Sequence, residues 1–212
     1  MNIKLANLND LNEITELHCL SFKPKDHVPM MLGKDYVKAT YKWLILSNES
    51  YVLIGKDKSK IIGLVAVCDG AFTKPMFIAC LPEFILSIVL KPTRLFSKML
   101  WKRFLRRPDV DSNKISIIDS PGFAQMTIGA VDSNSRGSGI FGLLIEETRN
   151  ISSKRGSLGI RAGVYKKNKS SRRVFEKSGW QEMNFLETEE TVFYTSFFND
   201  EFENKMKRII NK

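Results

Sequence analysis

One short segment constrains this chain more than any other, because it joins an apolar run to an amphipathic run through an arginine and two glycines. It reads Val131-Asp132-Ser133-Asn134-Ser135-Arg136-Gly137-Ser138-Gly139-Ile140-Phe141-Gly142. The pattern predicts a strand, a tight turn and a helix start. Glycines let a turn aim backbone N–H groups at a ligand, and a helix N-terminus adds about half a positive charge. The segment is therefore expected to bind a phosphate or pyrophosphate.

Two familiar phosphate-binding motifs do not fit this segment. A P-loop needs a lysine after its last glycine, and no such lysine follows Gly137, Gly139 or Gly142. Residues 137–142 spell G-x-G-x-x-G, the dinucleotide fingerprint, but that loop directly follows the first strand of its domain. Here polar residues intervene, and the next apolar strand (158–165) ends in Tyr-Lys-Lys without the acidic residue that binds a ribose. Too little chain remains for a doubly wound sheet.

A second segment downstream, residues 168–180, has helical spacing. Asn168 is a natural N-cap, and Gly179 suits the position after the last helical turn. Together with Arg136 and Gly139, this segment resembles the Gcn5-related N-acetyltransferase (GNAT) superfamily. Its apolar or small face consists of Ser171, Val174, Phe175 and Ser178.

The resemblance rests on two motifs in order. The family carries [Q/R]-x-x-G-x-[G/A] after a strand ending in valine, and later N-x-x-A-x-x-[L/V]-[Y/F]-x-K-x-G-[F/W]. The chain departs at Phe141, where glycine or alanine is usual, at Ser171, where alanine is usual, and at Phe175, where many members carry tyrosine. The matching residues are Arg136, Gly139, Asn168, Val174, Lys177, Gly179 and Trp180.

The resemblance implies an α/β (α+β) fold with a mixed, mostly antiparallel central sheet flanked by helices. It also implies an N-acetyltransferase that transfers an acetyl group from acetyl-CoA to a small amine. The coenzyme A pyrophosphate would bind the backbone of Arg136 to Phe141, and the pantetheine arm would lie between the strands ending at Val131 and Tyr165. A β-bulge near Ala130 would free an N–H for the thioester carbonyl. The implied coenzyme-binding residues are Ala130, Val131, Arg136, Gly137, Ser138, Gly139, Ile140, Phe141, Asn168, Ser171 and Phe175.

The acid and base of such a reaction are not evident. An attacking amine must be neutral, yet the strand 124–131 has no carboxylate, where many relatives place one. Phe175 replaces the tyrosine that many members use as acid, and a thiol with a pKa of about 8.5 leaves without full protonation. Asp132 is expected to brace the loop. The candidates for the base, chosen for expected proximity to the cleft, are Asp26, His27, Asp119 and Glu187, and the candidates that could substitute for the missing acid are Tyr165 and Tyr194.

The other apolar patterns predict one domain over residues 1–212. Its first five elements have the order β-α-α-β-β. The expected elements are a strand at 3–6, a helix with Leu11, Ile14, Leu17 and Leu20 inward, a helix at 33–46, a hairpin of 50–55 with 61–68, a strand at 124–131, a helix at 140–152, a strand at 158–165, a helix at 170–177, strands at 182–186 and 191–198, and a short helix or frayed tail at 199–212.

A helical insertion is expected at about 72–120, between the third and fourth strands. Residues 84–107 combine apolar side chains with basic ones and no acid, and Pro92 divides them into two short helices. Neither apolar run reaches the roughly 20 residues of a spanning helix. Two interpretations stay open: a lid whose apolar face covers the cleft, or an interfacial helix on a membrane. With Phe22 and the segment 31–36, the insertion resembles GNAT proteins found among bacterial surface-polysaccharide genes, which implies an amino sugar as acceptor.

Cysteine and histidine usage narrows the chemistry. Cys19, Cys68 and Cys80 form no C-x-x-C pair and are expected as buried thiols in a reducing cytosol. Two histidines are too few for a protein zinc centre, so no metal site is expected. His18 is expected to lie on a helix, partly packed against the sheet, and His27 is expected to be exposed in a polar loop.

Charge leaves several partners open. The net charge of +10 attracts coenzyme A, nucleotide-linked sugars, nucleic acid and acidic membranes alike. Nucleic acid is not expected, because the basic residues interleave with apolar ones and no recognition motif is visible. No signal peptide is evident, so a cytoplasmic location is expected, with peripheral contact on the inner membrane face as the membrane variant. A protein or peptide acceptor, and a non-catalytic acyl-CoA-binding module recruited to membrane, are the competing functions. A monomer or a homodimer is expected.

Overall fold

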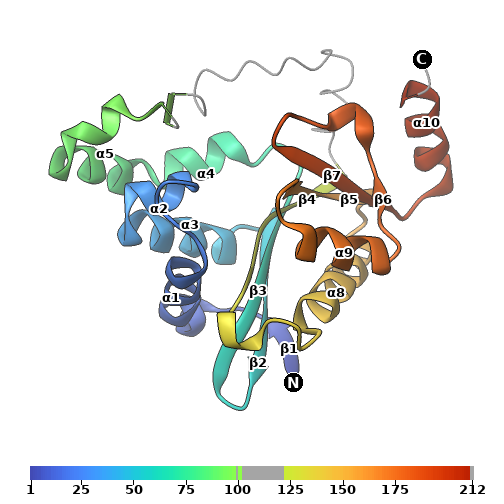
Figure 1. The fold of residues 1–212 in the computed structure, drawn as a ribbon, viewed down its shortest axis with the longest axis horizontal. Coiled ribbons are helices and arrows are strands. Elements are labelled where there is room, and N and C mark those ends of the chain that lie inside the picture. Colours follow the sequence, from blue (N-terminus) through green and yellow to red (C-terminus); the bar gives the residue numbers. More distant parts are fainter. Residues whose placement is uncertain (99, 102–121, 211–212) are drawn as a thin grey trace.

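A single seven-stranded sheet organises the chain (Figure 1). The computed structural model describes residues 1–98, 100–101 and 122–210. The strand order is β1-β2-β3-β4-β5-β7-β6, and only the β4–β5 pair is parallel. This confirms the predicted mixed, mostly antiparallel sheet. The strands are β1 (Asn2–Leu5), β2 (Ser50–Asp57), β3 (Lys60–Asp69), β4 (Phe123–Val131), β5 (Gly159–Tyr165), β6 (Gln181–Glu182) and β7 (Thr191–Phe197).

Helices cover both faces of the sheet, and each face has its own apolar core. Alternate residues of a strand point to opposite faces, so Leu53 joins one core while Val52 and Ile54 join the other. We call the core under α8 and α9 the first core, and the core under α1 and α3 the second core. The helices are α1 (Leu11–Ser21), α2 (Val28–Leu32), α3 (Lys34–Leu46), α4 (Thr73–Ala79), α5 (Leu81–Leu90), α8 (Ile140–Lys154), α9 (Lys169–Lys177) and α10 (Asp200–Ile210), with short 3₁₀ turns η1 (Leu8–Asp10), η2 (Pro92–Phe96), η3 (Ser133–Ser135) and η4 (Asn184–Leu186).

Most predicted elements are confirmed within a few residues. The helix expected at 33–46 is α3, and its inward face is the expected one. The helix expected at 170–177 is α9, with Asn168 accepting a hydrogen bond from the Ser171 N–H at 3.1 Å and Gly179 at a φ of +74°. The motif helix α9 therefore begins and ends where its capping residues indicate.

Three details differ from prediction. Leu20 is 81% exposed, because the inward stripe of α1 continues through His18. Cys19 is only partly buried, whereas Cys68 and Cys80 are buried. The strand expected at 182–186 is wrong beyond Glu182. Met183 and Leu186 are both buried three residues apart, a spacing that suits the 3₁₀ turn η4 and not a strand.

The insertion between β3 and β4 begins with α4, α5 and η2, which pack beside α2 and α3 (Figure 1). Pro92 separates α5 from η2 as predicted, although α5 begins at Leu81, ahead of the expected residue 84. Residues 102–121, which include the predicted stretch 102–107 and Asp119, lie outside the described residues. Within the described part, no single helix is long and apolar enough to cross a membrane; α4 and α5 pass only as a pair bent by 60°.

Two glycine substitutions, one expected to lower the free energy of unfolding and one to raise it, test the packing. A Cβ on Gly159 would lie 2.8 Å from the Phe123 ring and 3.0 Å from the Ser196 carbonyl oxygen, so Gly159→Ala is expected to lower the free energy of unfolding by about 1–3 kcal/mol. A Cβ on Gly142 would meet Val174 at an ordinary 3.8 Å, so Gly142→Ala is expected to raise it by roughly 0.5 kcal/mol. Urea unfolding measures both; a Gly159→Ala variant as stable as the parent would contradict the packing of β4 against β5.

Candidate functional site

The parallel strands β4 and β5 separate partway along their length, and this gap is the centre of the candidate site. Only Phe123–Met126 of β4 pair with β5, and their partners are Gly159–Ala162. Beyond that point β4 continues to pair with β3 and β5 continues to pair with β7. The facing edges of residues 127–131 and 163–165 therefore present backbone groups to the gap. An extended ligand fits between two such edges.

A β-bulge at Thr127 marks the point where the strands separate. Ala66 of β3 pairs with Ile128 and Val67 pairs with Met126, so Thr127 is the extra residue. Its hydroxyl donates to the Ala66 carbonyl at 3.2 Å. The bulge predicted near Ala130 and Val131 is therefore wrong in position. Met126 packs in the first core and Ile128 against the second, so the change of facing must occur between them.

The loop after β4 has the conformation that its glycines permit. Gly137 and Gly139 have φ values of +82° and +84°, and nothing lies within 4 Å of a Cβ placed on either. Gly139 is the N-cap residue of α8, with no side-chain cap. The first N–H groups of this 15-residue helix consequently face outward with their partial positive charge. Asp132 braces the loop as expected, since its carbonyl accepts from the Ser135 N–H and its carboxylate pairs with Lys60.

Positive charge collects at the end of the gap. Arg136 is exposed on one side, with no ion pair recorded in the described part of the chain. On the other side, Lys166 and Lys167, which pair with Glu187 and Asp26, follow β5 and lead to the N-terminus of α9. Because β4 and β5 are parallel, the α8 and α9 N-termini lie at the same end of the sheet (Figure 1). This edge, at the carboxyl ends of parallel strands, suits an anion such as a pyrophosphate.

Phe141, the residue that departs from the family pattern, is accommodated by a glycine on β4. A Cβ on Gly129 would lie 2.9 Å from the Phe141 ring. The ring also meets the edge of Phe175 at a centroid distance of 6.0 Å. Phe141 is therefore turned toward the sheet and away from the N–H groups of the loop.

Phe175 is buried at 1% exposure and stacks on Tyr194 with centroids 5.3 Å apart. It lies behind the gap as part of the wall, together with Trp180. The Tyr194 hydroxyl donates to Glu176 at 2.9 Å and accepts from Arg172 at 3.2 Å, and burial raises the pKa of Tyr194 to about 12. This hydroxyl is committed to α9 and is a weak proton donor.

The structure brings two of the candidates, Asp26 and Tyr165, to one end of the gap through Lys167, and His27 follows Asp26 in the same loop. Tyr165 is the last residue of β5 and is 44% exposed. Lys167 lies 5.6 Å from the centre of its ring and pairs with Asp26 at 3.8 Å. The α1–α2 loop thus reaches across from the second-core side to the turn after β5. Glu187 pairs with Lys166 at the same end. None of these contacts was predicted.

His27 is half-buried, not exposed as expected, because its ring stacks on Phe22 at 4.5 Å. Its Nδ1 lies 3.3 Å from Nε2 of the fully buried His18, and Nδ1 of His18 lies 2.8 Å from the Tyr41 hydroxyl. Burial, with a smaller effect of His27, lowers the pKa of His18 to about 3. His18 is therefore neutral near pH 7 and fixes the orientation of His27. Sequence reasoning missed this role, although the spacing of His18 from Ile14 places both on the inward stripe of α1.

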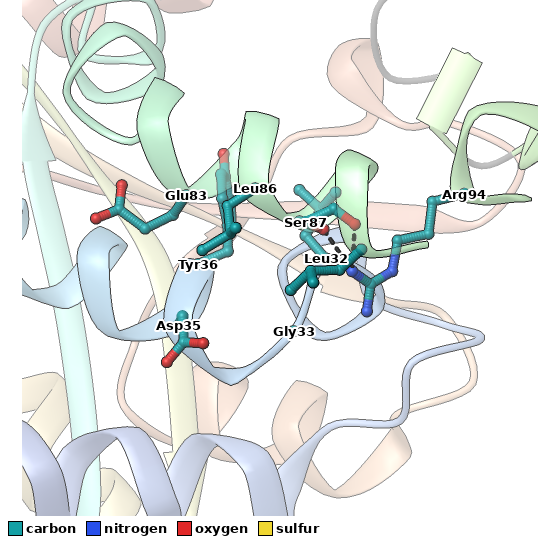
Figure 2. Close-up of a pocket in the computed structure, with 9 residues that line it drawn as sticks. Leu32, Gly33, Asp35, Tyr36, Glu83, Leu86, Ser87 and Arg94 are labelled. Carbon is teal, nitrogen blue, oxygen red and sulfur yellow. Dashed lines mark hydrogen bonds between the residues drawn. The ribbon is translucent and has the colours of Figure 1, made fainter. Parts of the chain in front are cut away.

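A small pocket of about 110 Å³ lies between α5 and the α2–α3 junction (Figure 2). Leu32, Gly33 and Tyr36, from the 31–36 segment singled out in the sequence, line it. Glu83 and Arg94 line the opposite side. The volume is well below the roughly 300–1,000 Å³ of typical ligand sites. The 31–36 segment therefore serves here to seat the insertion.

Comparison with known proteins supports the fold through structure alone. Neither the protein-family models nor the curated protein sequences give a match to this chain. Among solved structures, PaiA N-acetyltransferase from Thermoplasma acidophilum, in complex with coenzyme A, has a TM-score of 0.59 at 12% identity, covering 93% of this chain and 100% of that one. Ribosomal-protein-alanine N-acetyltransferase from Brucella melitensis gives 0.58 at 14% identity, covering 93% and 100%. The GNAT domain of S. lividans PAT gives 0.58 at 11% identity, covering 92% and 89%.

These similarities establish that the chain has the GNAT fold. At such low identity they establish the fold alone. The activity must be argued from the residues around the gap.

The buried His18 predicts how stability depends on pH. Its pKa is about 3 in the folded protein and about 6.5 in the unfolded chain, so between these values only the unfolded chain binds the proton. The free energy of unfolding should fall as pH is lowered through this window, by up to about 1.4 kcal/mol per pH unit. A His18→Gln variant should lack this part of the dependence. Urea unfolding of both proteins between about pH 7 and pH 4 measures it; identical losses in the two would contradict the assignment.

Proposed function

We propose that the chain is an acetyl-CoA-dependent N-acetyltransferase that acts on a small amine. The observation that carries the proposal is the gap between β4 and β5, which opens beside the uncapped N-terminus of α8. A strand gap bordered by an anion site suits a long ligand with a phosphate at one end and a reactive group at the other. The GNAT fold, common to several solved N-acetyltransferases, supports this choice of ligand.

Three features of the loop fit the coenzyme. The left-handed Gly137 and Gly139 have open space beside them, and Gly139 gives the helix no side-chain cap, so its first N–H groups, of which that of Ile140 makes a long 3.5 Å bond to the Ser138 hydroxyl, can bind a pyrophosphate. Arg136 supplies a formal positive charge. The pantetheine arm would lie along residues 127–131, with an N–H of β4 near Ala130 or Val131 holding the thioester carbonyl. Asn168 and Ser171 would border the arm from the start of α9.

His27 is the residue we assign as general base. In the tautomer whose Nδ1–H donates to His18, the Nε2 lone pair of His27 accepts the proton of the attacking amine. The resulting imidazolium of His27 still donates its Nδ1–H to His18. Because His18 stays neutral, the positive charge remains on His27. Asp26 lies next to it but is already paired with Lys167. This base approaches from the second-core side, opposite the anion site.

The leaving thiolate needs little acid catalysis. A thiol with a pKa of about 8.5 departs largely as the anion at neutral pH. Of the two tyrosines that could act as the acid, Tyr165 is preferred. It lies at the end of β5, at this end of the gap, whereas the Tyr194 hydroxyl is bonded to α9. Phe175 contributes only to the wall.

Two classes of acceptor are in competition. An amino sugar is our first choice, as the resemblance to surface-polysaccharide GNAT proteins implies. A peptide amine gains support because the described part of the insertion packs on α2 and α3, which is not the position of a lid over β4 and β5 (Figure 1). Release of free thiol with a panel of amino sugars, alkylamines and peptides separates the two.

Coenzyme binding tests the site itself. Acetyl-CoA is expected to raise the melting temperature of the parent protein, and Arg136→Glu should weaken apparent binding on the order of tenfold or more, because repulsion replaces a charged hydrogen bond to phosphate. Lys42→Glu, the same charge reversal on the exposed side of α3, should have no such effect. Thermal shift across an acetyl-CoA titration gives the measurement. Failure of acetyl-CoA to stabilise the parent would reject the proposal.

His27 can be tested separately. His27→Gln should lower kcat/KM by about 10²–10⁴ and remove the ascending limb of its pH profile, because glutamine cannot accept the proton. Asp26→Asn should change kcat/KM by only a few-fold. The assay is thiol release with an amine that the parent accepts. An unaltered pH profile in His27→Gln would place the base elsewhere while leaving coenzyme binding intact.

A further inference from the structure

Exposed apolar side chains concentrate on the outward side of α4, α5 and η2. Nine of the sixteen exposed large apolar residues in the described part of the chain lie between 78 and 101, so they form a patch and are not scattered. Val89 is 67% exposed, Leu90 68% and Phe96 85%. The apolar outer face, as we call it, consists of Ile78, Leu81, Ile85, Val89, Leu95, Phe96 and Trp101, and at its edge Leu86 and Leu90, which also line the small pocket beside α2 and α3.

The inner side of the same helices is fixed to the domain. Cys80, Phe84 and Ile88 pack with Leu32 and Tyr36 of α2 and α3. α5 therefore cannot rotate its outer face inward without losing these contacts. Both sides of α5 are apolar, yet only one is covered within the described residues.

Arg94 fixes the end of α5. Pro92 has no N–H to continue the helix, and the Arg94 guanidinium folds back beneath α5 to donate to the Ser87 carbonyl at 2.8 Å and to the Ser87 hydroxyl at 2.6 Å (Figure 2). This bond holds η2 against α5, so that Leu95 and Phe96 continue the outer face. A helix that is apolar all round belongs in a protein core or a membrane.

This geometry decides between the two interpretations left open by the sequence. A lid would bury its apolar side over the end of the gap. In the described part, the inner side packs on α2 and α3, whereas α9 covers the other face of the sheet, and the outer face points to solvent (Figure 1). The packing of residues 84–98 and 100–101 therefore favours the membrane interpretation over the lid.

The charged residues around the apolar outer face indicate which kind of partner it fits. Residues 73–101 contain four basic residues, Lys74, Lys91, Arg94 and Lys98, and one acidic residue, Glu83, and the net charge of the chain is +10. Lys91 and Lys98 are exposed beside the apolar residues. A second copy of the chain, related by a twofold axis, would bring the same basic residues together. Basic residues around exposed Phe, Leu and Trp match an anionic lipid surface.

We propose that the apolar outer face docks on an anionic lipid bilayer. Val89, Leu90 and Phe96 enter the boundary between headgroups and acyl chains, while Lys91 and Lys98 contact the lipid phosphates. Docking holds the domain by its insertion and leaves the gap between β4 and β5 facing the aqueous phase. The proposal does not depend on the acetyltransferase activity.

Vesicle sedimentation of the full chain tests the proposal. In low salt the parent should sediment with vesicles of phosphatidylcholine and phosphatidylglycerol in equal parts, and less with phosphatidylcholine alone, because the lysines add electrostatic attraction. Val89→Glu/Phe96→Glu should reduce the bound fraction on the order of tenfold or more. The matched control Leu20→Glu/Leu46→Glu changes two exposed leucines of α1 and α3, at 81% and 57% exposure, and should bind like the parent.

Three results would overturn the proposal. The first is the absence of sedimentation of the parent at low salt. The second is equal loss in the outer-face and control variants, which would indicate general charge in place of docking. The third is a parent that elutes as a dimer in light scattering, becomes monomeric in Val89→Glu/Phe96→Glu and does not sediment with vesicles, which would assign the face to a second copy. Far-UV circular dichroism verifies that the variants are folded.

Discussion

The separation of β4 from β5 is the constraint on which the rest of this structure depends. Four residue pairs join the strands before the bulge at Thr127, and none joins them after it. Because each strand remains paired on its outer side, the sheet stays rigid while its middle opens. Both helices that follow these strands then begin at the open end. The same geometric event therefore produces the slot, the exposed backbone groups and the two helix N-termini.

The gap also links the two faces of the sheet. The anion site and Phe141 belong to the first-core side, whereas His18, His27 and Tyr41 belong to the second-core side. An acyl group carried into the gap from the first side would meet an amine arriving from the second. The Asp26–Lys167 pair ties the α1–α2 loop to the turn after β5 at this junction. In the proposed reaction, the donor and acceptor sites are separated by the sheet itself.

Local patterns made the fold largely predictable. Asn168 and Gly179 set the ends of α9 through capping, and the apolar spacing of 33–46 identified the buried side of α3 correctly. The bulge was misplaced because its position depends on which core each β4 residue faces, a tertiary property. His27 was misjudged for a similar reason: its polar sequence neighbours suggested exposure, while Phe22 and His18 bury it from a different element. The proposed coenzyme residues follow from a local motif, whereas the proposed acid–base residues come from the α1–α2 loop and from β5.

Hydrogen–deuterium exchange with and without coenzyme A tests the central claim most directly, since it reports on backbone N–H groups one segment at a time. The account predicts slower exchange on binding in peptides covering 127–142 and 163–171, with α3 and α5 unchanged. Slower exchange confined to other segments, or unchanged exchange across 127–142 at saturating coenzyme A, would contradict the assignment of the gap as the coenzyme site.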